Sequence, residues 1–299
     1  MTLTKSVNKI TEAIFIACLS LISLYLSRYS LIFMGLIPVL LALTSFKDGF
    51  LSALLKVGFT YISALVFLNI DQINTSFIPL VLVGLIFVIL ISLKIPDKYQ
   101  IFLSFVLISL VFIFLFKLEM IENKLTIDKM ALDFKQMVES SYSYRFDLDI
   151  YKSTVALYPS LISMIVMAYS VLSIKLIRNY LSFMGKGIDD IKELDQIRIE
   201  YKDLLGLTII FAIIYFLANF MNIERTYILA NLIFISMIIL VTNGISLFDY
   251  MLKKSSLPLT RAFQWFFMII LFQVIFIPLL FFGFADIFID FRSRRKNAK

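Results

Sequence analysis

The sequence has no histidine and only one cysteine, Cys18, among its 299 residues. An intramolecular disulfide is therefore impossible, and zinc sites made of cysteine and histidine are excluded. A Ser-His-Asp triad is excluded because it needs histidine. The sequence also lacks the Gly-x-x-x-x-Gly-Lys-Ser/Thr loop that binds nucleotide phosphates. We therefore expect no enzymatic activity, no cofactor, no metal site and no ATP hydrolysis by that loop.

Charged residues are also scarce, at 16% of the chain, whereas hydrophobic residues make up 61%. Soluble domains usually have about 25% charged and about 45–50% apolar residues. The 31 phenylalanines and the mean hydropathy of +0.94 indicate surfaces that face lipid or neighbouring helices. The net charge of +7 does not indicate a nucleic-acid partner, because the basic residues lie in short connections and in the tail.

Apolar runs of helical length recur along the whole chain. A spanning helix needs about 20 mostly apolar residues, and a transmembrane β-strand would show a shorter, alternating pattern. We therefore predict an all-α, polytopic membrane protein with about nine transmembrane helices (eight to ten) in one integral domain over residues 1–299. The first run has no small-x-small cleavage site after it, so we interpret it as a retained span. The predicted spans are 10–26, 31–46, 50–68, 77–93, 101–116, 154–175, 204–221, 227–248 and a last run over 262–291.

Two longer polar segments interrupt this pattern, at 119–152 and 178–203. The first holds seven acidic and five basic residues, and its apolar residues between Ile127 and Val138 fall at helical spacing. This spacing predicts an amphipathic helix on the membrane surface, which is either a solvated connector or a lid over a site. In the second segment, residues 188–197 have the pattern of a short amphipathic surface helix.

The distribution of lysine and arginine predicts the orientation. With the N-terminus in the cytoplasm, the basic connections and the 178–203 segment fall inside, and the 119–152 segment falls outside. The last run conflicts with this scheme, because one further crossing places the basic tail outside. Either 262–291 is one long tilted helix, or it breaks at Pro278 and returns inside. The length favours one crossing, since two full spans need about 40 residues.

Polar residues in or beside spans are the candidate functional residues of a membrane protein. Each also has a simpler interpretation. Glu12 suits a helix N-terminus, Lys56 can extend its amine to the surface, and the asparagines either line a polar groove or bond helices together. Acids at positions 286 and 290 share a helix face, and position 290 pairs by spacing with Arg294. The candidates are Glu12, Lys56, Asn231, Asn243, Asp249, Asp286, Asp290 and Arg292.

Four short motifs, taken in order, resemble the YybS-like predicted membrane proteins of Gram-positive bacteria. They are Thr11-Glu12-Ala13, Ile37-Pro38 with Lys47-Asp48-Gly49, Asn243-Gly244-Ile245-Ser246-Leu247, and Gly283-x-x-Asp286-x-x-x-Asp290-Phe291-Arg292. The family commonly has Thr-Glu-Gly-Ala where this chain has Thr-Glu-Ala.

That family is similar in layout to the substrate-binding (S) components of energy-coupling-factor vitamin transporters. The resemblance implies a six-helix unit formed by the first six spans. It also implies that Ala13 and Ala17 contact a transmembrane coupling subunit.

Two functions follow as hypotheses. One is a small-molecule-binding component for vitamin-like uptake in the bacterial plasma membrane, which works with a coupling subunit and a separate ATPase. The other is a non-transport scaffold or regulator that engages partners through the 178–203 segment and the tail. The ligand is not identified by either hypothesis.

Overall fold

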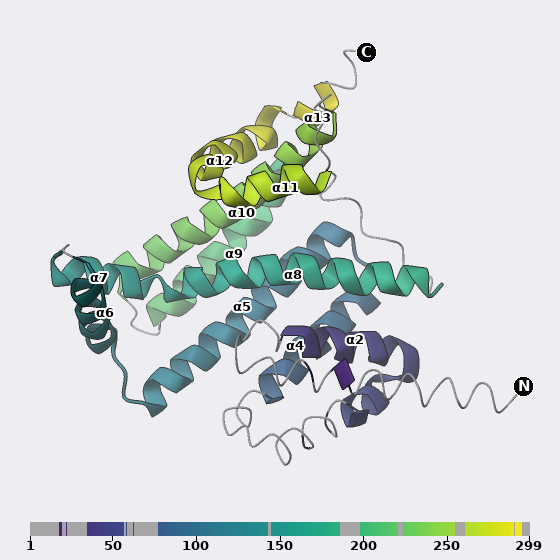
Figure 1. Cartoon of the computed structure of the whole chain (residues 1–299), viewed down its shortest axis with the longest axis horizontal. Helices are drawn as coiled ribbons and strands as arrows, with labels where there is room; N and C mark the ends of the chain where they lie inside the picture. Colours follow the sequence, from purple (N-terminus) through teal and green to yellow (C-terminus); the bar gives the residue numbers. More distant parts are fainter. Residues whose placement is uncertain are drawn as a thin grey trace, which may run out of the picture. The chain divides into compact units, whose positions relative to one another are not determined.

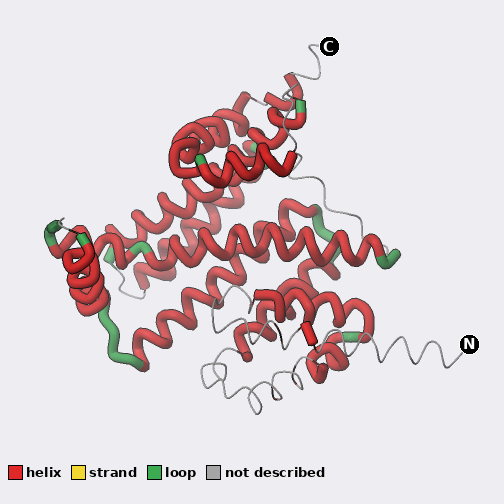
Figure 2. Tube along the Cα trace, viewed as in Figure 1, coloured by secondary structure: helices red, strands yellow, loops and turns green. Residues whose placement is uncertain are grey.

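The computed structural model describes residues 18, 19, 22, 35–56, 58, 62, 77–142, 145–185, 198–220, 224–254, 261–289 and 291–294. All the elements in these ranges are helices, which confirms the all-α prediction for this part of the chain (Figures 1 and 2). Most of the first predicted span, the 188–197 helix, and the positions of Glu12, Ala13, Ala17 and Asp290 lie outside the described residues.

Four of the helical stretches are long and apolar enough to cross a membrane, which is typical of a membrane protein. They are α5 (Asp97–Glu122), the joined pair α7 (Leu148–Ala156) and α8 (Tyr158–Phe183), α10 (Arg225–Lys253) and α12 (Phe272–Ile289). The apolar helix α4 (Phe77–Ser92) is shorter, and α9 (Tyr201–Phe220) covers most of the predicted seventh span. The count of nine spans stays a prediction.

The chain forms two compact units. The first comprises 1–115 and 165–191, and the second comprises 116–164 and 192–299. The long helices α5 and α8 contribute residues to both units. The single integral domain of the sequence analysis stays a prediction.

In the first unit, α2 (Leu36–Asp48) packs against α4. Helix α2 begins after Gly35 with Pro38 in its first turn, where the missing N–H of proline costs no helix bond. It ends at Gly49, whose φ of 88° is readily adopted only by glycine. The short second apolar run is thus a short helix, and the Lys47-Asp48-Gly49 turn lies where the sequence predicts it.

In the second unit, the predicted amphipathic helix of the 119–152 segment is confirmed as α6 (Ile127–Ser141). The hydroxyl of Thr126 caps its first turn by accepting a hydrogen bond from the backbone N–H of Lys129. The helix packs on α7 through Phe134, whose ring meets the buried Tyr151 ring edge-on at 5.9 Å between centroids.

The last apolar run is two helices, α11 (Arg261–Ile270) and α12, with the break at Leu271. The expectation of one long helix is therefore wrong, and so is the expected break at Pro278, which lies inside α12. Apolar helices tolerate an internal proline when neighbouring helices support the surrounding turns. Helix α12 has this support, because it crosses α10 closely.

The crossing of α10 and α12 depends on Gly244 and Gly283. A Cβ atom at Gly244 would lie 2.0 Å from the carbonyl oxygen of Leu279, and one at Gly283 would lie 2.0 Å from that of Leu240. Only hydrogen fits at these contacts, so the two backbones touch directly. Small residues allow such close contacts between helices in membranes.

Replacing Gly244 or Gly283 by alanine should therefore separate the helices and lower the free energy of unfolding by about 1–3 kcal/mol. Thermal and denaturant unfolding in mild detergent would measure the loss. Gly206→Ala in α9 is the matched control, because its Cβ meets no atom within 4 Å. The control should be neutral or slightly stabilising. Equal effects at Gly206 and Gly283 would contradict the close crossing.

Candidate functional site

Polar side chains of the second unit gather at two places along α10. One group surrounds Asp286, near the C-terminal half of α10. The other surrounds Asn231, near its N-terminus. The first group, the Asp286 cluster, consists of Arg198, Asn243, Ser246, Asp286 and Arg292.

The carboxylate of Asp286 has no exposed surface. One of its oxygens lies 3.1 Å from Nη2 of Arg292 and 3.7 Å from Nε of Arg198. Neither carboxylate oxygen accepts a hydrogen bond from a described residue, so its stabilisation is mainly electrostatic. Arg198 also donates a hydrogen bond from Nη2 to the backbone oxygen of Asp286, at 2.8 Å.

Asn243 joins three chain segments. Its amide nitrogen donates to the backbone oxygen of Gly283 at 2.8 Å, and its amide oxygen accepts from the backbone N–H of Ile199 at 3.2 Å. The side chain is 2% exposed. It therefore links α10, α12 and the chain just before α9 beside the close crossing.

Further along the same face of α10, Ser246 and Tyr250 hold Arg292 in α13 (Phe291–Arg294). Arg292 donates from Nη1 to the hydroxyl of Ser246 at 3.3 Å, and the hydroxyl of Tyr250 donates to the backbone oxygen of Arg292 at 3.0 Å. The buried Asp249 lies three residues after Ser246 on α10. The start of α13 is thus fixed beside α10.

This arrangement is a network of ion pairs and hydrogen bonds between chain segments. The carboxylate of Asp286 lies between two guanidinium groups, which balance its charge. Within the described ranges, no group of three acidic or cysteine side chains is placed to hold a metal ion. What the cluster does is connect four segments of the chain.

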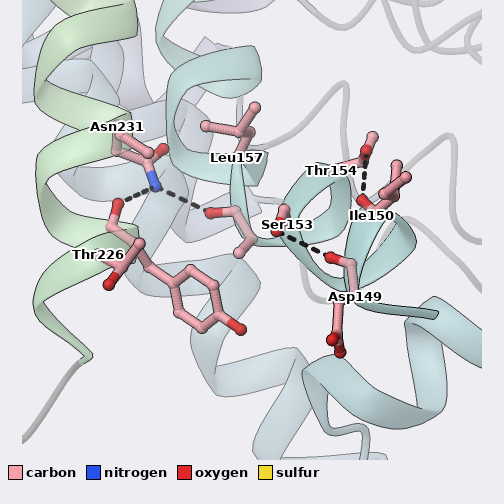
Figure 3. Close-up of a pocket in the computed structure, with 10 residues that line it drawn as sticks. Asp149, Ile150, Ser153, Thr154, Leu157, Thr226 and Asn231 are labelled. Atoms are coloured by element: carbon pink, nitrogen blue, oxygen red, sulfur yellow. Dashed lines mark hydrogen bonds between the residues drawn. The ribbon is translucent and has the colours of Figure 1, made fainter. Parts of the chain in front are cut away.

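The second group forms a pocket of about 400 Å³ between α7, the start of α8 and the first two turns of α10 (Figure 3). Its volume falls in the range of small-molecule sites. The lining residues are Asp149, Ile150, Ser153, Thr154, Ala156, Leu157, Thr226, Tyr227, Ala230 and Asn231.

Asn231 fastens the wall of this pocket. Its amide nitrogen donates to the backbone oxygens of Ala156 and Tyr227, each at 2.9 Å (Figure 3). Its amide oxygen accepts from the backbone N–H of Ser160 at 3.1 Å and from the Ser160 hydroxyl at 2.6 Å. Both amide hydrogens of Asn231 are therefore already used inside the protein.

Two hydroxyls that line the pocket already donate hydrogen bonds within the protein. Ser153 donates to the backbone oxygen of Asp149 and Thr154 to that of Ile150, each at 2.8 Å. Among the described residues, no side chain bonds to the Asp149 carboxylate, and the nearby Lys152 pairs instead with Asp128 at 2.7 Å. Of the polar side chains that line the pocket, the Asp149 carboxylate and the Ser153 and Thr154 oxygens can accept from a ligand, and the Thr226 and Tyr227 hydroxyls can donate or accept.

In the first unit, Arg178 forms a buried ion pair with Asp97 at 2.5 Å and donates to Gln100 at 3.0 Å. The candidate Lys56 forms an ion pair with Asp48, at the end of α2. These contacts bind helices together and do not line a described pocket.

The structure brings three of the sequence-predicted residues together, namely Asn243, Asp286 and Arg292. Asn231 lies apart from them in the pocket wall, and Lys56 lies in the other unit. Asp286 contacts Arg292 and Arg198, and the predicted pair of Asp290 with Arg294 lies outside the described residues because Asp290 is not described. The sequence pattern did not single out Arg198, since it is one of several basic residues in a mixed-sign segment.

Comparison with protein-family models, curated proteins and solved structures finds no match for the chain. The resemblance to the YybS-like proteins therefore stays a prediction that rests on the four motifs.

Asp286→Asn should leave two largely buried guanidinium groups without their counter-charge. Loss of one partner of a buried ion pair typically costs about 3–5 kcal/mol, so we expect a loss of that order in the unfolding free energy in mild detergent. Glu139→Gln is the control, because its half-exposed pair with Lys135 at 3.9 Å should contribute less than about 1 kcal/mol.

A double-mutant cycle with Arg292→Gln measures how strongly the two cluster residues depend on each other. Because the pair is in direct contact, the double variant should lose less stability than the sum of the single variants. Additive losses, or a loss at Asp286 no larger than at Glu139, would contradict the ion-pair assignment.

Proposed function

We propose that the protein is a small-molecule-binding component of an uptake system in the bacterial plasma membrane. The observation that carries this proposal is the pocket of about 400 Å³ at the N-terminal end of α10. The Lys/Arg distribution of the sequence places this end of α10, together with α6 and α7, on the outer side of the membrane. A pocket there would meet its ligand before any transport step.

The pocket chemistry favours a ligand that donates hydrogen bonds, such as an amine of vitamin size. The hydroxyl hydrogens of Ser153 and Thr154 are used inside the protein, whereas their oxygens can still accept, and the Asp149 carboxylate can only accept. The Asp149 carboxylate adds a negative charge at the pocket wall. A protonated amine satisfies both features, because charge-assisted hydrogen bonds are the stronger ones.

Energy for uptake would come from other subunits, because the sequence has no phosphate-binding loop. The resemblance to S components supports a separate ATPase and a coupling subunit that packs against Ala13 and Ala17. Alanines four residues apart share a helix face and permit close approach of another helix.

A second candidate function is a scaffold or regulator, and the Asp286 cluster favours it. Arg198 and Ile199 belong to the 178–203 segment, and Arg292 begins the tail. The cluster therefore joins the two parts of the chain through which such a protein would engage partners.

Ligand binding can be tested by thermal unfolding of the purified protein in mild detergent with a panel of vitamin-sized primary amines. The matched N-acetylated compounds and equal-sized carboxylates serve as comparison ligands. Amines should raise the unfolding temperature, and Asp149→Asn should weaken their binding by about ten- to a hundredfold, since a hydrogen bond to a charged group contributes about 1.5–3 kcal/mol.

Asp133→Asn on α6 is the matched control, because Asp133 is exposed and does not line the pocket. It should bind amines as the unsubstituted protein does. Stabilisation by carboxylates alone would instead indicate that the first turns of α7 and α10 bind an anion. No response to any compound would count against the pocket as a ligand site.

The coupling partners can be tested by co-purification from native membranes. The unsubstituted protein should retain an ATPase and a membrane subunit, and the combined substitutions Ala13→Leu and Ala17→Leu should release them by blocking close helix contact. Ala212→Leu, at an exposed position of α9, is the control and should retain them. If the co-purifying proteins include no ATPase and stay bound to the double variant, the result would favour the scaffold or regulator function instead.

A further inference from the structure

We infer that α11 and α12 form a re-entrant pair that enters and leaves the bilayer on the same side and is embedded in the inner-leaflet lipid. This inference concerns the membrane partner of the C-terminal region and does not depend on the proposed ligand. It follows from where the two ends of the pair lie relative to α10.

The pair follows the C-terminal end of α10 in the chain, and its own C-terminal end lies beside that same end of α10. The chain leaves α10 after Lys253 and enters α11 at Arg261. When α12 has ended, Arg292 contacts Tyr250 and Ser246, which belong to the last two turns of α10. The number of crossings between Lys253 and Arg292 is therefore even.

Contacts of the chain just before α9 indicate independently on which side of the membrane α12 ends. Arg198 donates to the backbone of Asp286, and the N–H of Ile199 is bound by Asn243. Arg198 and Ile199 end the 178–203 segment, which its basic residues place in the cytoplasm. The end of α12 and the tail are thus on the cytoplasmic side. The basic residues after Phe291 favour the same side.

The length of the pair excludes two complete crossings. Helix α11 has 10 residues and α12 has 18 residues, which correspond to about 15 Å and about 27 Å at 1.5 Å per residue. Two spans of a hydrocarbon core of about 30 Å need about 40 residues. The number of crossings is even and two crossings are excluded, so the pair makes no complete crossing. It enters the membrane and returns to the same side.

The bend at Leu271 is compatible with lipid. Its N–H donates to the carbonyl of Phe267 at 2.9 Å, and its carbonyl accepts from the N–H of Ile275 at 3.0 Å. Both backbone polar groups at the bend are therefore satisfied within the chain. That is the condition for placing a bend in hydrocarbon, where no water is present to bond to them.

The exposed surface of the pair matches the inner leaflet. Most of its large apolar side chains are exposed, whereas Gln264, Gly283 and Asp286 are buried, as are the apolar Met268, Leu279 and Ile287. Basic residues flank both ends, at Arg261 and from Arg292 onward, where anionic headgroups attract them. The exposed apolar residues are Phe263, Phe266, Phe267, Ile270, Leu271, Val274, Ile277, Phe281, Phe282, Phe284, Phe288 and Ile289.

Cysteine accessibility in intact cells tests the inference. In a Cys18→Ser background, single cysteines replace Ser256 after α10 and Asn297 in the tail, and Ser143 provides a reference in the 119–152 segment. A membrane-impermeant maleimide should label the residue 256 and residue 297 variants only after lysis, and the residue 143 variant before it. Labelling of residue 297 from the side opposite to residue 256 would overturn the inference.

Leu271→Cys distinguishes a re-entrant pair from two full crossings. The cysteine at the bend should resist the impermeant reagent from both sides and react only after the membrane is dissolved in denaturing detergent. Labelling at residue 271 from the side opposite to residue 256 would show two crossings and would also overturn the inference. Each variant is scored only at wild-type expression and unfolding temperature, and Lys299→Cys repeats the tail measurement if Asn297→Cys folds poorly.

Discussion

The second unit depends on placing a buried negative charge between two positive ones. Removing a carboxylate from water costs several kcal/mol, and the cost is offset only where opposite charges lie close and in good geometry. Asp286 meets this condition only when Arg198 and Arg292 both reach it. These residues come from the chain before α9, from α12 and from α13, so satisfying one carboxylate fixes three segments. The glycine contact between α10 and α12 makes this possible, because it brings the end of α12 close to the polar face of α10.

Helix α10 separates the two proposed roles along its length. Near its N-terminus, Asn231 binds α7 and α8 beside the pocket that contains Asp149. Toward its C-terminus, Asn243 binds α12 and the chain before α9. The same residue type thus joins helices at both places, which is the use expected of asparagine in apolar surroundings. The proposed ligand site and the segments proposed to face partners therefore lie toward opposite ends of α10.

The sequence predictions succeeded where a local pattern was enough. The apolar runs from Phe77 onward coincide with long helices, and the helical spacing between Ile127 and Val138 marked α6. They failed where the outcome depended on neighbours. One long helix and a break at Pro278 were the two expectations for the last run, yet the break lies at Leu271, and α10 packs against the helix around the proline. Helical spacing did not reveal the partners of Asp286, whose charge is balanced by Arg292 and by a residue 88 positions earlier in the chain.

The amino-acid sequence by itself determined the apolar character of the long helices and excluded sites that need histidine. Hydrophobicity and the absence of histidine are sums over residues, and they do not depend on how the chain packs. The pocket, the Asp286 cluster and the close crossing of α10 and α12 were decided only by tertiary structure. Each depends on contacts between residues that are far apart in the chain. Asn231, for example, donates a hydrogen bond to the backbone oxygen of Ala156 in α7. A hydrogen bond or an ion pair acts over a few ångströms in space, whatever the separation of its partners along the chain.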